Sequence, residues 1–229
     1  MGAALANPAR RLRRLMLTAE AEAGLTAEFP PPWRIAHERV DRQVFAGMFP
    51  ADAVHQGAAL LVEPLPALEL DTALEHAEGP IMVLDQVTDP RNVGAILRSA
   101  AAFGAAALVM QDRHAPPETG SLARAASGAL ELVPVVRVVN LARALEELKQ
   151  AGCWVVGLAA DAPVTLAQVQ RGLAGRRCAL VLGAEGEGMR RLTREHCDEL
   201  ARLPIASRME SLNVSAAAAV ALYELVRET

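Results

Sequence analysis

Three polar clusters carry side chains whose spacing could support chemistry. The first is DPRNVGAILRSAAAFG, in which Asn92, Gly94 and Arg98 fall on the opening turns of a helix that Asp89-Pro90 can start. Gly94 and Arg98 share a helix face, and the missing side chain at Gly94 lets a ligand or a second backbone approach. Taken alone, the string is more typical of a capped helix with a surface arginine.

The second cluster is a glycine-rich stretch between a strand and a helix, LVLGAEGEGMRRL. An apolar strand that runs into Gly183 and Gly186 is typical of a backbone loop that holds a ligand at the carboxyl edge of a parallel sheet. The spacing matches neither a dinucleotide-binding fingerprint nor a P-loop. Because Glu185 and Glu187 would repel a phosphate tail, the loop favours a cation, or a ligand with a ribose and an ammonium group. The alternative is a flexible turn.

The third cluster, RMESLNVSAAAAVALYEL, follows the apolar segment LPI. Ser211 lies where a helix N-cap is expected, which leaves Asn213 and Ser215 unexplained. Main-chain groups beside the apolar side chains of LPI would suit a purine. The alanine run 216–219 predicts a helix with a small-residue face that permits close packing.

The elements that position these clusters alternate from residue 80 onward, which is typical of an α/β fold with a parallel sheet covered on both faces. Strands are expected at 81–84, 107–110, 133–139, 153–159, 177–183 and 203–205. Helices are expected at 92–103, 121–132, 141–150, 189–197 and 211–227. Residues 1–66 indicate a small α/β module with strands at 14–17 and 58–62 and helices at 19–24 and 41–48, and residues 67–79 are expected to be a linker.

Composition narrows the class of protein. Hydrophobic residues make up 52% of the chain, yet no uninterrupted apolar run reaches the length of about 18 residues that a membrane span needs, and residues 1–14 show no signal peptide. The 3 cysteines have no metal-ligand spacing and their odd number argues against a disulfide framework. We therefore expect a cytoplasmic protein without a metal site.

The net charge of the chain allows binding of a polyanion only through a local basic patch. The net charge of −4 argues against indiscriminate polyanion binding. Arginine suits phosphate because its planar fork makes paired hydrogen bonds, although a solvated arginine face is an equal alternative. The densest arginine cluster consists of Arg10, Arg11, Arg13 and Arg14.

In this order, the three clusters resemble the three motifs of the SpoU (TrmH-like) methyltransferases of the SPOUT superfamily. The resemblance covers residues 80–229 and rests on Asn92, Gly94 and Arg98, on LGAEGEGM, and on LPI followed by SLNVS. The segments ALANPARR and AVHQGAALLVEPLP resemble the small RNA-binding module of the RlmB-like branch, which methylates guanosine riboses in ribosomal RNA. That module usually opens with another strand, so here it is expected to be N-terminally truncated.

The resemblance implies a C-terminal deep trefoil knot, a homodimer formed through the knotted domain, and S-adenosylmethionine as methyl donor. It implies 2′-O-methylation of a guanosine ribose in ribosomal RNA, 23S RNA by branch, with the arginine cluster 10–14 on the RNA. The implied cofactor-binding residues are Gly183, Gly186, Leu203, Ile205, Leu212 and Val214. The implied catalytic residues are Asn92, Arg98, Glu185, Ser211 and Asn213.

The role of Arg98 can be narrowed by chemistry. A guanidinium in a protein stays protonated, so we expect Arg98 to clamp a phosphate next to the target ribose rather than to act as a base. None of the 5 histidines lies in a motif, so no general base is identified. Glu185 either braces its loop or orients Asn92 and Arg98, and Ser211 and Asn213 either face the substrate or brace the knot.

Three alternatives compete with this interpretation. A transfer RNA 2′-O-methyltransferase differs only in the N-terminal module, where the HQG match favours ribosomal RNA. A catalytically inactive RNA-binding or ribosome-assembly factor would not need Asn92, Arg98, Glu185 and Asn213. A Rossmann enzyme would place its glycine loop after the first strand, whereas this loop comes near the end of the chain.

Overall fold

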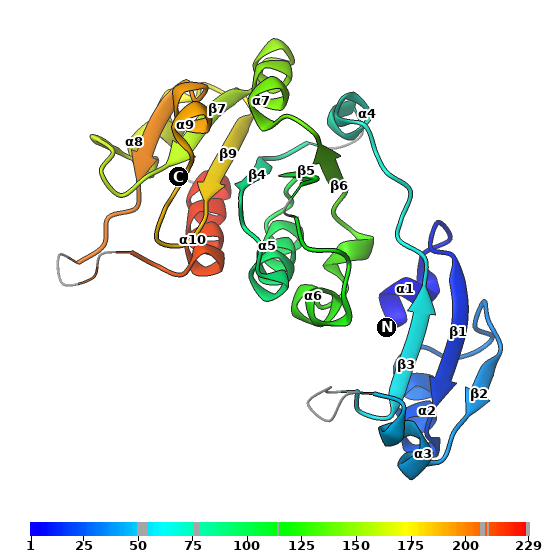
Figure 1. Cartoon of the computed structure of the whole chain (residues 1–229). Coiled ribbons are helices and arrows are strands. Elements are labelled where there is room, and N and C mark those ends of the chain that lie inside the picture. Colours follow the sequence, from blue (N-terminus) through cyan, green and yellow to red (C-terminus); the bar gives the residue numbers. More distant parts are fainter. Residues whose placement is uncertain (50–54, 76–77, 114, 207–208, 210, 228–229) are drawn as a thin grey trace. The chain divides into compact units, whose positions relative to one another are not determined.

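The computed structural model describes residues 1–49, 55–75, 78–113, 115–206, 209 and 211–227. The chain divides into two compact units, Met1–Pro66 and Ala67–Thr229, which we call the N-terminal and C-terminal units (Figure 1). Within the described residues, no helix is both long and apolar enough to cross a membrane.

The N-terminal unit contains a three-stranded sheet in the order β2-β1-β3. Its strands are β1 (Leu12–Leu17), β2 (His37–Arg39), which runs parallel to β1, and β3 (Ala58–Val62), which runs antiparallel to it. Its helices are α1 (Gly2–Ala6), α2 (Ala19–Glu28) and α3 (Arg42–Gly47). A small core forms around Leu5, Leu15 and Leu17, whereas Arg13 and Arg14 of β1 are exposed.

The C-terminal unit is built on a seven-stranded parallel sheet in the order β6-β5-β4-β9-β7-β10-β8. This confirms the predicted parallel sheet. Its strands are β4 (Ile81–Asp85), β5 (Ala107–Gln111), β6 (Val135–Val138), β7 (Trp154–Leu158), β8 (Val164–Thr165), β9 (Cys178–Gly183) and β10 (Glu199–Arg202). The helices are α4 (Leu70–Glu75), α5 (Pro90–Ala102), α6 (Gly120–Ala126), α7 (Leu141–Gln150), α8 (Leu166–Gly172), α9 (Arg191–Glu195) and α10 (Val214–Val226), with a 3₁₀ turn η1 at Ala129–Glu131.

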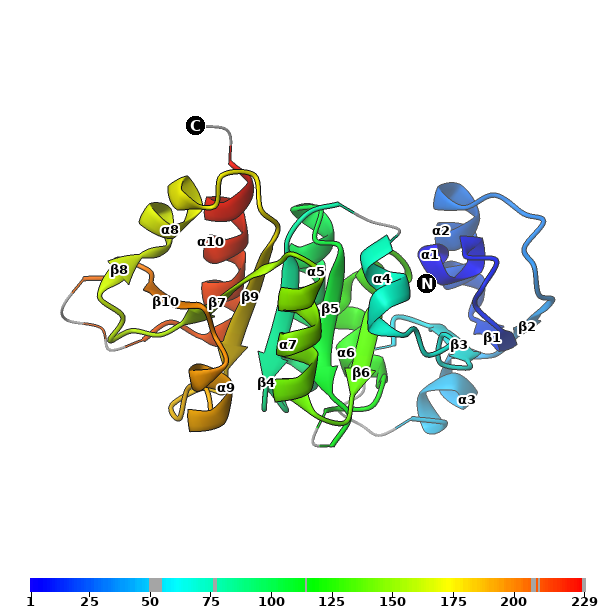
Figure 2. The same cartoon turned by 90° about the horizontal axis from the view of Figure 1, so that it is seen from above.

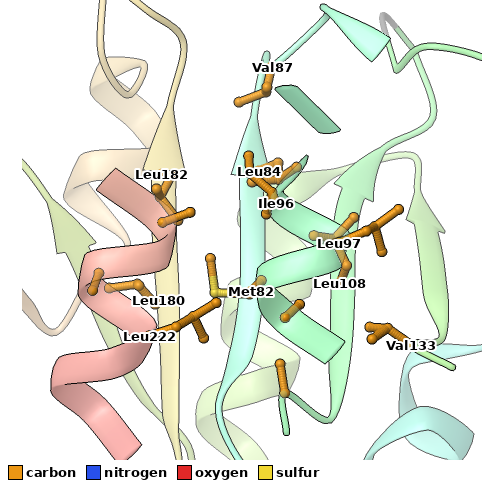
Figure 3. Packing of buried hydrophobic residues seen from close by; sticks show 14 of the residues in the cluster. Met82, Leu84, Val87, Ile96, Leu97, Leu108, Val133, Leu180, Leu182 and Leu222 are labelled. Atoms are coloured by element: carbon orange, nitrogen blue, oxygen red, sulfur yellow. The ribbon is translucent and has the colours of Figure 1, made fainter. Parts of the chain in front are cut away.

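Both faces of this sheet are buried, which is why its strands are continuous apolar runs. Side chains alternate along β4: Met82 and Leu84 pack with α5 and α10, whereas Ile81 and Val83 pack with α4 and α7 on the opposite face. Figure 2 shows these helices in two layers around the sheet. Figure 3 shows the first face, where Met82 lies among side chains of β9, α5 and α10.

Several expected elements differ from the structure. The segment 67–79 is not a plain linker, because α4 buries Leu70 and Ala73 in the core of the C-terminal unit. The expected helix 121–132 ends at Ala126, since Ser127 and Gly128 take left-handed conformations with φ of 50° and 95°. Residues 203–205, expected to be a strand, lie outside one; the strand of this region is β10, which ends at Arg202.

Candidate functional site

The first cluster lies on α5 at the carboxyl end of β4. Asp89 caps this helix by accepting a hydrogen bond from Arg91 N at 2.8 Å, and Pro90 is its first residue. A Cβ built on Gly94 would lie 2.4 Å from the carbonyl oxygen of Leu122. The missing side chain at Gly94 therefore allows the close packing of α5 on α6. Of the two expected neighbours, a ligand or a second backbone, the structure shows the backbone.

Arg98 lies on the exposed surface of α5. Within the part of the chain that the structure describes, its guanidinium has no hydrogen bond or ion pair. The structure therefore leaves the charge and the planar fork of Arg98 open to an anionic ligand.

The second cluster forms a narrow loop, residues 183–188, which we call the glycine loop. Ala184 N donates to Gly188 O at 3.1 Å and Gly188 N donates to Ala184 O at 2.9 Å, so the loop closes on itself. A Cβ on Gly183 would lie 2.0 Å from the carbonyl carbon of Gly188, and Gly186 takes a φ of 81°. The glycines are therefore required by this conformation, and the loop is a defined hairpin rather than a flexible turn.

The carboxylate of Glu185 connects all three clusters. Its Oε1 accepts a hydrogen bond from Asn92 Nδ2 at 3.2 Å, a short one from Asn213 Nδ2, and one from Val214 N at 3.2 Å. Asn213 Nδ2 also donates to Asn92 Oδ1 at 3.1 Å, although these residues are 121 positions apart in the sequence. We call Glu185, Asn92, Asn213 and Val214 N the Glu185 cluster. Glu185 therefore contacts Asn92, and among the described residues no hydrogen bond or ion pair joins it to Arg98.

Asn213 rather than Ser211 caps the last helix, which corrects the expectation from the sequence. Asn213 Oδ1 accepts hydrogen bonds from Ser215 N at 3.0 Å, Ser215 Oγ at 2.6 Å and Ala216 N at 3.3 Å. The helix therefore starts at Val214, not at residue 211. Ser211 is exposed and has no hydrogen bond among the described residues.

The residues expected to bind a cofactor differ in their position and exposure. Gly183 and Gly186 lie in the glycine loop, and Val214 contributes its backbone to the Glu185 cluster. Leu203 packs against the core, whereas Ile205 and Leu212 are more exposed. The neighbouring residues 207, 208 and 210 lie outside the described residues.

Sequence reasoning missed a buried ion pair at the base of the glycine loop. Asp85, the last residue of β4, is fully buried and binds Arg190, which follows the loop. An aspartate that ends a continuous apolar strand was the available signal, because a carboxylate is rarely buried without a partner. No group of three or more histidine, cysteine, aspartate or glutamate residues in the described chain is arranged to hold a metal ion.

The arginine cluster 10–14 belongs to the N-terminal unit and is largely paired. Arg10 is only 2% exposed and donates to Glu63 O at 2.9 Å, so it lies inside the unit, contrary to the expected surface role. Arg13 pairs with the Glu63 carboxylate and Arg11 lies 3.7 Å from it. A pocket of about 280 Å³ opens here. It is lined by Pro8, Arg10, Arg11, Leu12, Arg13 and Arg34.

Arg14 makes the best-defined ion pair of this cluster. Its Nε and Nη2 donate to the two carboxylate oxygens of Glu38 at 2.9 and 2.7 Å, a paired geometry across β1 and β2. The hydrogen bond from Arg14 lowers the pKa of the Glu38 carboxyl below its usual range. Arg14 is therefore already bound to a carboxylate within its own unit.

The sequence of the C-terminal unit matches a known class of protein. Residues 79–223 match the SpoU rRNA Methylase family, and the chain belongs to that family. Two relatives are named 23S rRNA (guanosine-2'-O-)-methyltransferase RlmB. The protein from Pasteurella multocida is 50% identical over 180 residues, which cover 76% of this chain and 72% of the relative. The protein from Pseudomonas aeruginosa is 48% identical over 183 residues, covering 78% and 73%.

Solved structures share the same fold. The SpoU methyltransferase AviRb from Streptomyces viridochromogenes, in complex with AdoMet, superposes with a TM-score of 0.77 at 24% identity, covering 98% of this chain and 85% of that one. An AdoMet-bound rRNA methyltransferase from Sinorhizobium meliloti gives a TM-score of 0.76 at 23% identity, covering 97% and 82%.

Proposed function

We propose that this protein transfers a methyl group from S-adenosylmethionine to the ribose 2′-oxygen of a guanosine in 23S ribosomal RNA. The observation that carries the proposal is the Glu185 cluster, which joins three distant segments at the carboxyl edge of the sheet. This is the edge at which α/β sheets bind ligands. The names of the Pasteurella and Pseudomonas relatives supply the nucleoside and the RNA.

The residues around the glycine loop fit S-adenosylmethionine. The carboxylate of Glu185 suits a ligand that carries sulfonium and ammonium charges, and the exposed side chains of Ile205 and Leu212 suit a purine. We assign cofactor binding to Gly183, Gly186, Leu203, Ile205, Leu212 and Val214. When bound, S-adenosylmethionine supplies a methyl group on a positively charged sulfur, already activated for transfer.

The chain's own residues position the acceptor. We assign to Arg98 the phosphate next to the target ribose, because its fork is open to an anion and stays protonated. Fixing two reactants in line can lower the activation free energy by about 7–11 kcal/mol. Glu185 holds Asn92 and Asn213 in one arrangement, and we place the Ser211 hydroxyl on the substrate side. The 2′-hydroxyl proton leaves to water as the methyl–oxygen bond forms.

We extend the proposal to a deep trefoil knot. The chain leaves β9 in the middle of the sheet, forms β10 beyond β7, and returns so that α10 packs on α5, α8 and β9. The order of these elements supports a threaded C-terminal segment, since α10 lies back near the strand from which the segment departed.

We also propose a homodimer formed through this domain. Val220, Tyr223 and Val226 recur at three-residue spacing on α10, and Tyr223 is 56% exposed. Together they form an apolar stripe on one helix face. A second copy of the chain would cover it.

We assign RNA binding to residues 1–66 and methyl transfer to residues 80–229. Within the first range, Arg11, Arg13 and Arg14 reach the surface, and Arg10 braces the sheet from inside through Glu63 O. The basic pocket beside Arg11 and Arg13 supports contact with RNA phosphates. An enzyme that modifies ribosomal RNA would act in the cytoplasm.

Transfer of a labelled methyl group tests the proposal. Purified protein is incubated with methyl-labelled S-adenosylmethionine and unmodified 23S ribosomal RNA, and the labelled nucleotide is mapped. We expect label on the 2′-oxygen of a guanosine. Label on a base, preferential labelling of transfer RNA offered in parallel, or binding of RNA without any transfer would overturn the reaction, the substrate or the enzymatic role respectively.

A further inference from the structure

We infer that Asp85 is a positioning residue for the methyl donor site and acts through the glycine loop without touching a ligand. The inference rests on the methyl transfer proposed above. Asp85 ends β4 and its side chain is 0% exposed, so no bound molecule can reach its carboxylate in this arrangement.

Arg190 binds this carboxylate through several donors. Arg190 N donates to Asp85 Oδ2 at 2.9 Å, Nε donates to Oδ1 at 2.7 Å, and Nη2 lies 2.6 Å from the same oxygen. A fully buried carboxylate is costly unless it is paired and hydrogen-bonded. Because a main-chain N–H is among the donors, Asp85 fixes the path of the backbone as well as the Arg190 side chain.

This pair closes the base of the glycine loop. Asp85 lies opposite Gly183 in the register of the neighbouring strands β4 and β9. The loop therefore leaves the sheet beside the Asp85 carboxylate and returns to it at Arg190. Glu185 lies between these two ends, so the position of its carboxylate depends on how firmly the base is held.

Gln111 fixes the outer end of the arginine fork. Arg190 Nη2 donates to Gln111 Oε1 at 3.0 Å, and Gln111 is the last residue of β5, the strand beside β4. The guanidinium thus spans the carboxyl ends of two strands. A lysine at position 190 would supply a single ammonium instead of a planar fork and could not reproduce this arrangement.

A matched pair of variants separates positioning from general stability. Asp85→Asn is compared with Asp198→Asn, since Asp198 also accepts a backbone hydrogen bond, from Val155 N at 2.9 Å, but near the amino end of β7. Calorimetric titration with S-adenosylmethionine gives the affinity, and thermal unfolding gives the stability. We expect Asp85→Asn to weaken binding about tenfold, as for the loss of one charge-assisted hydrogen bond. Asp198→Asn should change it less than about twofold, and the Tm of each variant shows how much of its loss of affinity follows from a loss of stability.

A double variant that changes Asp85 and Glu185 tests whether Asp85 acts through the glycine loop. If Asp85 acts through Glu185, Asp85→Asn weakens binding less in a Glu185→Gln background than in the wild type. If Asp85→Asn does not fold, Gln111→Ala loosens only the outer end of Arg190 and should weaken binding in the same direction.

Three results would overturn the inference: unchanged affinity in both Asp85→Asn and Gln111→Ala, equal weakening by Asp198→Asn, or additive effects of the changes at Asp85 and Glu185. A wild-type protein that binds no S-adenosylmethionine contradicts the proposed function instead, so the two failures are distinguishable.

Discussion

The arginine cluster 10–14 of the N-terminal unit and the candidate site of the C-terminal unit hold their charged side chains in opposite ways. In the N-terminal unit, Glu63 and Glu38 pair with arginines of the cluster 10–14 and join neighbouring strands. In the C-terminal unit, Glu185 is held by amide and backbone N–H groups, and neither it nor Arg98 has an ion pair among the described residues. Most of the charge in this arginine cluster is paired within its own unit, whereas the charges of Glu185 and Arg98 stay available to a ligand.

The largest expected effect comes from removing the unpaired charge of Arg98 in the C-terminal unit. Arg98→Ala should lower turnover about 100-fold, the cost of losing a charge-assisted contact to phosphate, while S-adenosylmethionine affinity and stability stay close to the wild type because Arg98 is exposed. Steady-state transfer of labelled methyl groups measures the change.

Arg98→Lys sharpens this result, since it keeps the charge and removes the fork. Partial activity in Arg98→Lys shows that charge suffices. Near-normal turnover of Arg98→Ala would remove Arg98 from the mechanism.

The next effect concerns the cap that the Glu185 cluster shares with α10. Asn213→Ala should lower the free energy of unfolding by about 1 kcal/mol, because the cap acceptor for Ser215 N and Ala216 N is lost. Ser211→Ala should change it by less than about 0.5 kcal/mol. Chemical denaturation followed by circular dichroism compares the two, and a larger loss for Ser211→Ala would reassign the cap.

A smaller effect tests the pairing of charges in the N-terminal unit. Arg11 is 78% exposed and lies 3.7 Å from its carboxylate, whereas Arg14 is bound by both oxygens of Glu38. Arg11→Ala should therefore reduce the salt dependence of RNA binding by about one unit of the log–log slope, and Arg14→Ala should reduce it less. Filter binding over a range of salt concentrations measures both slopes. The reverse order would contradict the distinction between open and paired arginines.

The smallest effect is a pH dependence. The hydrogen bond from Arg14 lowers the pKa of Glu38 in the folded protein. The pair therefore contributes stability above the ordinary glutamate pKa, and this contribution is lost as the pH falls through the lowered folded value. Carboxyl titration by NMR should show the Glu38 midpoint rising towards its ordinary range in Arg14→Ala, and an unchanged midpoint would contradict the assigned cause.

Much of the C-terminal fold was predictable, because strands buried on both faces leave continuous apolar runs such as 81–84 and 178–182. The glycine loop was predictable for the same reason, since its position after β9 follows from the run that precedes it. Helix ends were less predictable. Ser211 and Asn213 can both cap a helix, and the structure shows that Asn213, which also contacts Glu185, is the cap.

Contacts between distant residues could not be predicted from local pattern. Asp85 and Arg190 are 105 positions apart, and nothing in either segment specifies the other. Arg10 looked like its neighbours in sequence, yet it is buried because its guanidinium satisfies the carbonyl of Glu63. The acidic residues of 67–79 indicated a linker, whereas Leu70 and Ala73 put an apolar face on α4.

Titration of the protein with S-adenosylmethionine tests most directly whether the Glu185 cluster is the methyl donor site. Glu187 lies in the same loop and is exposed, so Glu187→Ala is the matched control for Glu185→Ala. The wild type and Glu187→Ala should bind with similar affinity, and Glu185→Ala should bind at least about tenfold more weakly. A wild type that takes up no S-adenosylmethionine, or a Glu185→Ala variant that binds it as tightly as the wild type, would contradict the account.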